Sequence, residues 1–111
     1  MLPEIAYGEL VEALGPENVS KEPAVLDGYA WQAFTELVGM RSGWTPNRPA
    51  AVVLPGSTEE VQAVVRICNR HGLQFKAMCV GWGVWNMVGG ENVVQIDLRR
   101  MDRILEIDEK N

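Results

Sequence analysis

The chain has 111 residues, enough for one small domain, and its 47% hydrophobic and 23% charged content is typical of a folded globular protein. A net charge of −5 argues against a nucleic-acid-binding protein, which needs a basic surface. No apolar run approaches the roughly 20 residues of a membrane span, the acidic N-terminus is unlike a signal peptide, and two cysteines are too few for a disulfide scaffold. We therefore expect a cytoplasmic protein with reduced cysteines.

The N-terminal part of the chain predicts mainly short helices. Residues 3–14 place their apolar side chains on one helical face, and Gly15 and Pro16 end that helix because glycine suits a left-handed cap and proline cannot continue it. Residues 17–20 predict a short strand or turn, and residues 22–38 predict one or two short helical turns. Residues 41–49 predict a loop.

The second half carries clearer signals for a strand, a helix and further strands. Residues 50–55 predict a short buried strand that proline ends. Residues 56–72 predict a helix, with Ser57 as its N-cap, Glu60 completing a capping box and Gly72 at its end. Further strands are predicted over residues 73–78, 92–98 and 103–108. Strands alternating with a helix in this way indicate an α/β fold.

Between two of these strands lies the uncharged stretch "CVGWGVWNMVGG", residues 79–90. Glycines allow backbone N–H groups to approach and surround an anion, and a loop after a parallel strand is a favoured ligand position. The alternative is a structural turn with buried aromatic side chains. It matches neither the G-x-G-x-x-G dinucleotide fingerprint nor a P-loop, so spacing alone leaves both interpretations open.

Two longer segments carry a family resemblance, "RPAAVVLPGSTEEVQAVVRICNRHG" and "IDLRRMDRILEID". With the residues between them, about 48–108, they resemble the start of the FAD-binding domain of the p-cresol methylhydroxylase and vanillyl-alcohol oxidase type, a pattern that glycolate and D-lactate dehydrogenases share. The resemblance implies an α/β (α+β) fold: the N-terminal subdomain of that FAD-binding domain, with a small mixed or parallel sheet and flanking helices. It implies FAD as the cofactor.

In that family the loop after the second strand wraps the FAD pyrophosphate through backbone N–H groups. The resemblance therefore assigns cofactor binding to eight consecutive residues: Met78, Cys79, Val80, Gly81, Trp82, Gly83, Val84 and Trp85. Gly81 and Gly83 keep the family's glycines. Met78 stands where the family has arginine, Cys79 where it has a first glycine, and Trp82 where it has threonine or serine. Some members link FAD covalently through histidine or cysteine, and Cys79 is the only such residue in this loop.

Other chemically capable residues favour structural roles. His71 is the only histidine, and its place at a helix end favours a charge–dipole contact. Cys68 lies on the apolar stripe of its helix and is expected in the core. Asp97, Arg99 and Arg100 are expected to make structural hydrogen bonds. One histidine and two cysteines cannot assemble a metal site or a catalytic triad, so no catalytic or metal-ligating residue is expected.

We divide the chain into an N-terminal helical extension, residues 1–47, and the first part of an FAD-binding domain, residues 48–111. The resemblance implies part of an FAD-dependent oxidoreductase that acts on a hydroxy acid or an aromatic alcohol. Its partners would be the remainder of the FAD domain and a substrate domain, in the same gene or a separate subunit. The alternative is a non-catalytic interaction subunit or fragment that keeps the fold but has lost FAD binding, as Met78, Cys79 and Trp82 would permit.

Overall fold

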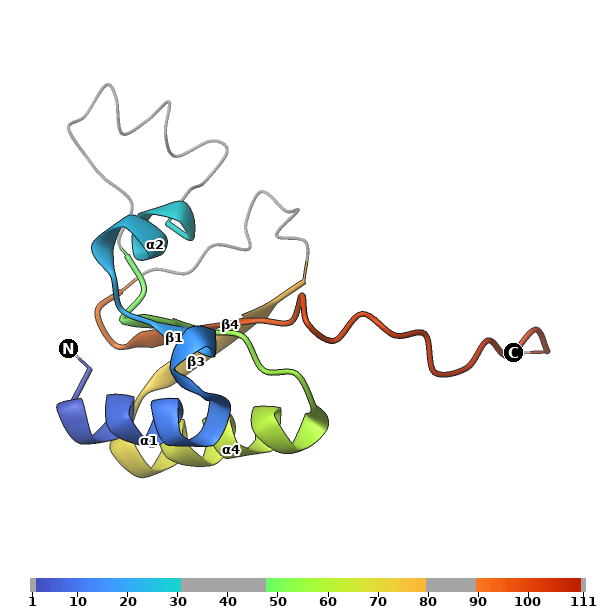
Figure 1. Cartoon of the computed structure of the whole chain (residues 1–111), viewed down its shortest axis with the longest axis horizontal. Helices are drawn as coiled ribbons and strands as arrows, with labels where there is room; N and C mark the ends of the chain where they lie inside the picture. The colour runs from blue at the N-terminus through green and yellow to red at the C-terminus, as the bar shows by residue number, and fades with distance from the viewer. Residues whose placement is uncertain (1, 31–47, 80–89, 111) are drawn as a thin grey trace, which may run out of the picture.

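The computed structural model describes residues 2–30, 48–79 and 90–110, which form one sheet with helices on both faces (Figure 1). Its elements, in chain order, are helix α1 (Glu4–Leu14), a short 3-10 turn (Pro16–Asn18), strand β1 (Val19–Ser20), helix α2 (Pro23–Gly28), strand β2 (Ala51–Val53), helix α4 (Thr58–His71), strand β3 (Gln74–Met78) and strand β4 (Val93–Asp97). The helix predicted before Gly15, the short strand or turn predicted after it, and the later strand–helix–strand pattern are confirmed.

Helix α4 begins and ends where its sequence signals predict. The Ser57 side chain accepts a hydrogen bond from the Glu60 N–H at 3.2 Å, which satisfies one of the free donors at the helix start. The Glu60 carboxylate reaches back to the N–H of Gly56, at 2.6 Å, one residue before the position that a capping box would use. Gly72 ends the helix in the left-handed region, with φ of 64°, and its N–H donates to the Cys68 carbonyl.

The four strands form a mixed sheet in the order β1-β2-β4-β3. Strands β2, β4 and β3 run parallel, and β1 pairs antiparallel with β2. Strand β4 is central and all five of its residues are buried. Val53 pairs with Ile96 and Met78 with Asp97, so the three parallel strands end at the same edge of the sheet. The predicted small mixed sheet with flanking helices is therefore confirmed.

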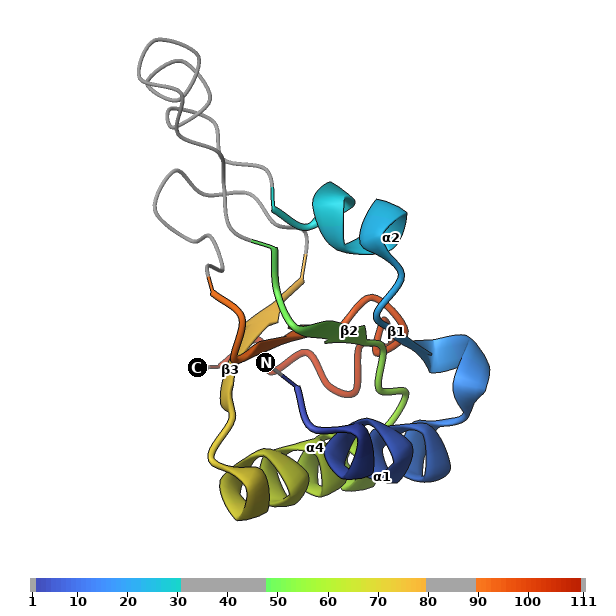
Figure 2. The ribbon, with the colours of Figure 1, turned by 90° about the vertical axis from the view of Figure 1, so that its left-hand side faces the viewer.

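Helices α1 and α4 lie side by side on one face of the sheet, and α2 lies on the opposite face (Figure 2). The core between the sheet and helices α1 and α4 contains three fully buried residues: Leu10 of α1, Val64 of α4 and Val94 of β4. At the edge of this layer, Glu9 accepts hydrogen bonds from Arg70 at 3.0 Å and contacts His71 at 2.8 Å. The N-terminal helix is thus joined through a shared core to the later βαβ unit, which consists of β2, α4 and β3.

The prediction of a strand at residues 103–108 is wrong. Residues 101–110, the C-terminal arm, have no regular secondary structure and extend away from the sheet, ending at the C-terminus in Figure 1. Strand β4, which precedes the arm, already has a neighbour on each side, and the arm does not pair with β1 or β3 at the edges of the described sheet. Ile104, Leu105 and Ile107 are consequently 78%, 86% and 74% exposed.

None of the helices in the described part of the chain is both long and apolar enough to cross a membrane.

Candidate functional site

The carboxyl ends of the three parallel strands form one edge of the sheet, which is the usual ligand position in an open α/β fold. The described residues that directly follow these strands are Leu54–Gly56, Cys79 and Leu98–Arg100. They contain two arginines and no acidic residue. The nearest carboxylate in the strands, Asp97, is fully buried. Both arginines bring positive charge to the strand ends, where Arg99 is paired with Asp97 and Arg100 lies 3.5 Å from Glu60.

The structure describes two of the eight residues predicted to bind the cofactor. Met78 is the last residue of β3 and is half-buried, and Cys79 follows it as an exposed residue with a free thiol. Both therefore lie at the carboxyl edge of the sheet. The other six residues lie outside the described part of the chain: Val80, Gly81, Trp82, Gly83, Val84 and Trp85. The assignment of all eight residues to cofactor binding stays a prediction.

A hydrogen-bonded cluster holds the end of β4. The Asp97 carboxylate accepts hydrogen bonds from the Tyr29 hydroxyl at 2.5 Å and from Arg99 Nε at 2.8 Å. Burial on its own would raise the pKa of Asp97, but the hydrogen bonds from Arg99 and Tyr29 hold it below its ordinary value. Burial and the adjacent carboxylate raise the pKa of Tyr29 to about 12. The expected structural role of Asp97 and Arg99 is confirmed.

Tyr29 is the member of this cluster that sequence reasoning did not identify. It lies at the end of α2, 68 residues before Asp97, and no local pattern connects the two. Arg100 also has the expected structural role, because its guanidinium donates to the Leu54 carbonyl at 2.7 Å and lies 3.5 Å from Glu60. It thereby ties the chain after β4 to the end of β2.

The two cysteines should differ strongly in reactivity. Cys68 is fully buried in α4, and burial raises the pKa of its thiol to about 11, so at pH 8 only about one thiol in a thousand is ionised. Cys79 is exposed. We expect a thiol reagent such as DTNB to modify one cysteine quickly in the native protein and the second only after denaturant is added. Cys79→Ser should remove the fast phase, and a fast phase that survives this substitution would contradict the prediction.

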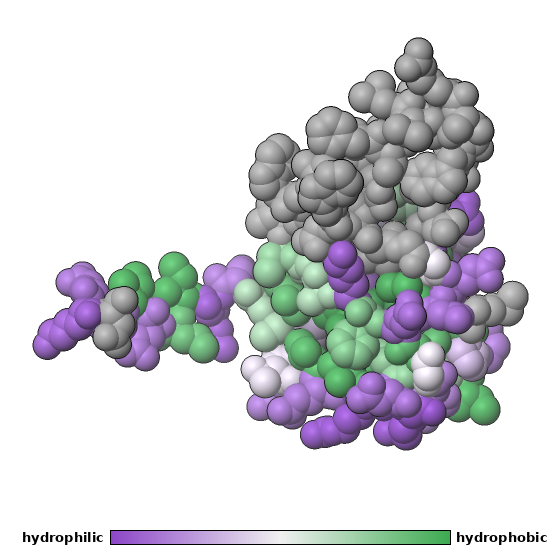
Figure 3. Space-filling model, turned by 180° about the vertical axis from the view of Figure 1, so that it is seen from behind, coloured by the Kyte–Doolittle hydropathy of each residue, from purple (hydrophilic) through white to green (hydrophobic). Residues whose placement is uncertain are grey.

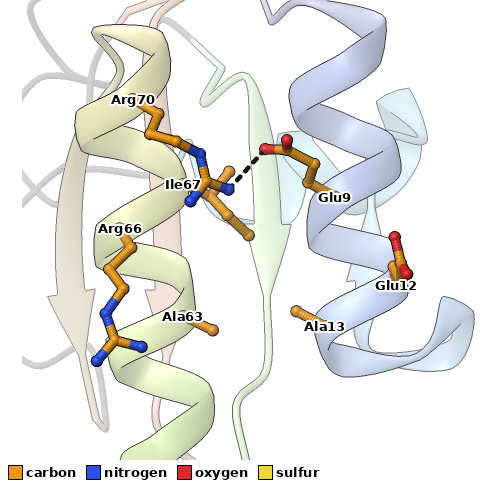
Figure 4. Close-up of a pocket in the computed structure, with 7 residues that line it drawn as sticks. All are labelled: Glu9, Glu12, Ala13, Ala63, Arg66, Ile67 and Arg70. Atoms are coloured by element: carbon orange, nitrogen blue, oxygen red, sulfur yellow. Dashed lines mark hydrogen bonds and ion pairs between the residues drawn. The ribbon is translucent and has the colours of Figure 1, made fainter.

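A groove lies on the helical face, between α1 and α4. This groove has a volume of about 440 Å³, and Ala13 and Ala63 point toward one another across it (Figure 4). The small side chains explain why the helices leave a gap there. Two glutamates, Glu9 and Glu12, and two arginines, Arg66 and Arg70, line the same groove, so its charges balance and it does not attract an anion. We therefore place the candidate cofactor site at the carboxyl edge of the sheet.

Comparison with known proteins identifies the family. The sequence model of a family described as an FAD binding domain matches residues 49–111. The chain is 36% identical, over 96% of its length, to a 1'-carboxy-chondrochloren decarboxylase from Chondromyces crocatus, and 29% identical, over 93%, to the glycolate oxidase subunit GlcD of Bacillus subtilis. It also resembles the solved structure of p-cresol methylhydroxylase with substrate bound, with 26% identity, a TM-score of 0.69 and 94% of this chain covered.

The chain belongs to the family of FAD-binding domains of the p-cresol methylhydroxylase type, found in FAD-linked oxidoreductases, and FAD is the cofactor of this family. The suggested resemblance and cofactor are therefore confirmed. The chain spans 19% to 20% of the length of these three relatives. The described residues fit such a cofactor, because the edge that would receive its phosphates carries Arg99 and Arg100 and keeps its one strand carboxylate, Asp97, buried.

Proposed function

We propose that this chain supplies the pyrophosphate-binding part of an FAD-dependent oxidoreductase, with residues Met78–Trp85 as the cofactor loop. The observation that carries the proposal is the position of Cys79, exposed directly after β3, at the edge where three parallel strands end beside two arginines. When bound, the isoalloxazine ring of FAD would supply the redox chemistry. The residues of this chain would hold and orient the nucleotide.

The substrate that fits best is a hydroxy acid or an aromatic alcohol. Two relatives support this class, since one is a subunit of a glycolate oxidase and another is a p-cresol methylhydroxylase. In the described part of the chain no set of side chains suited to acid–base catalysis lies at the carboxyl edge, where Asp97 is buried and already bonded to Tyr29 and Arg99. We therefore infer that the catalytic groups come from the rest of the enzyme.

The partner we propose is the polypeptide that completes the FAD domain, together with a substrate domain. Ile104, Leu105 and Ile107 of the C-terminal arm expose apolar side chains that water disfavours, and β3 is an edge strand with Phe75 42% exposed. Figure 3 views the molecule from behind, and the apolar residues of the arm stand clear of the folded body. We further propose a cytoplasmic location, in keeping with two free thiols, Cys68 and Cys79.

Cofactor binding can be tested through the reactivity of Cys79. If the loop wraps the pyrophosphate, FAD should slow alkylation of Cys79 by iodoacetamide, by about tenfold at a concentration of about ten times Kd, because only the free protein reacts. ADP, which carries the pyrophosphate, should also protect, whereas riboflavin, which lacks it, should not. Gly81→Asp should abolish protection, because the added carboxylate would repel the pyrophosphate.

The experiment also separates the two functions considered for this chain. Protection by FAD and ADP that Gly81→Asp removes would support cofactor binding. Equal alkylation rates with and without FAD, both for the chain alone and for the chain co-expressed with its neighbouring reading frames, would instead favour a non-catalytic interaction subunit. Met78 at the position of the family's arginine is the specific observation that favours that second function.

A further inference from the structure

The Asp97 carboxylate organises a tight turn directly after β4. Its Oδ1 atom accepts a hydrogen bond from the backbone N–H of Arg99 at 3.0 Å, which closes a side-chain-to-backbone turn two residues long. Its Oδ2 atom accepts from Arg99 Nε at 2.8 Å and lies 2.7 Å from Arg99 Nη2. One fully buried side chain therefore holds both the main chain and the side chain of Arg99.

This turn is connected to the end of the neighbouring strand. The turn encloses the peptide between Asp97 and Leu98, and the Leu98 N–H of that peptide donates to the carbonyl of Met78 at 2.9 Å. Met78 is the last residue of β3, and Cys79 follows it. The Asp97 turn orients the Leu98 N–H, and the hydrogen bond from this N–H holds the Met78 carbonyl. The direction in which the chain leaves the sheet at Cys79 therefore depends on this turn.

Tyr29 connects the same cluster to α2 on the second face of the sheet. Its hydroxyl donates to Asp97 Oδ2 at 2.5 Å and accepts from Arg99 Nη2 at 3.0 Å. The buried carboxylate therefore has a partner on each side, and no buried polar side-chain atom in the described part of the chain is left without one. Such a fully satisfied buried network favours one fixed geometry.

We propose that Asp97 is a positioning residue for the cofactor: it fixes the carboxyl end of β3, and so the path of Met78 and Cys79 toward the flavin nucleotide. This inference rests on the proposed FAD binding and assigns to Asp97 a role beyond stabilising the fold. Asp97 would act through the Leu98–Met78 hydrogen bond, without touching the cofactor. Tyr29 would support its orientation from α2.

Three substitutions separate positioning from general destabilisation. Asp97→Ala removes the acceptor of the turn, and Asp97→Asn keeps an oxygen at the Oδ1 position. Tyr29→Phe keeps the turn and removes only the two hydrogen bonds of the Tyr29 hydroxyl. We expect Asp97→Ala to weaken FAD binding to the full chain by about tenfold, which corresponds to the loss of one or two hydrogen bonds. Asp97→Asn and Tyr29→Phe should weaken it by less than about threefold.

A measurement without cofactor keeps this test independent of the proposed function. Amide hydrogen exchange followed by NMR should show the Leu98 N–H protected in the wild-type chain and in Asp97→Asn, and exchanging about tenfold faster in Asp97→Ala. The amide of Val64 in α4 should be unaffected in all three. If the wild-type chain binds no FAD, the proposed function fails, but the Leu98 exchange still decides whether Asp97 holds the strand end.

Unchanged Leu98 protection in Asp97→Ala would overturn the inference. Equal losses of FAD affinity in Asp97→Ala, Asp97→Asn and Tyr29→Phe would also overturn it, because that result indicates a general effect on stability. Should Asp97→Ala fail to fold, Asp97→Asn decides. Retained Leu98 protection with nearly unchanged FAD affinity supports positioning, and loss of both contradicts it.

Discussion

Leu10→Ala should lower the free energy of unfolding by about 2–5 kcal/mol, whereas Ile5→Ala, in the same helix, should change it by less than about 0.5 kcal/mol. Leu10 is fully buried in the core that α1 shares with α4 and the sheet, while Ile5 is 72% exposed. Removing the Leu10 side chain leaves a cavity among packed neighbours, and removing that of Ile5 does not. Both substitutions also raise helix propensity, so that effect does not separate them.

The expected loss is large for a domain of this size, whose total stability is of the order of 5–15 kcal/mol. Urea denaturation followed by circular dichroism would measure both variants against the wild-type chain. Comparable small effects of the two substitutions would mean that α1 is only an attached extension. A large effect confined to Leu10→Ala would show that the first helix is required for the βαβ unit to fold.

The features that the sequence predicted well are those set by neighbouring residues. The ends of α4 could be predicted from Ser57, Glu60 and Gly72, because capping depends on hydrogen bonds within a few residues of the helix ends. The strands β2, β3 and β4 were likewise evident from short apolar runs. The family resemblance added the cofactor, which no spacing of residues could have provided.

The features that the sequence did not predict depend on contacts between distant segments. The pairing of β1 with β2, and of Tyr29 with Asp97, joins residues far apart along the chain. The strand expected at residues 103–108 failed for a related reason, since alternating apolar residues form a strand only beside a partner. The division at residues 47 and 48 stays a prediction, although α1 and β1 share the core of the later strands.

The C-terminal arm should decide whether the chain associates with the partner polypeptide that we propose. Replacing Ile104, Leu105 and Ile107 by serine should weaken that association by more than about 100-fold, because burying each large apolar side chain contributes about 1.5–3 kcal/mol. Co-expression with the neighbouring reading frames, followed by affinity purification of the chain, would measure how much partner and how much bound flavin are retained. Glu106→Ser, a polar substitution in the same arm, serves as the matched control.

The triple serine variant should unfold at nearly the wild-type urea concentration, because the three side chains are 74% to 86% exposed and contribute little to the core. A stable variant that no longer retains its partner would therefore locate the loss in docking rather than folding. Retention of partner and flavin by the triple variant would contradict a docking role for the arm. Co-purification lost equally with Glu106→Ser would also contradict it, since charge or backbone effects would then outweigh apolar burial.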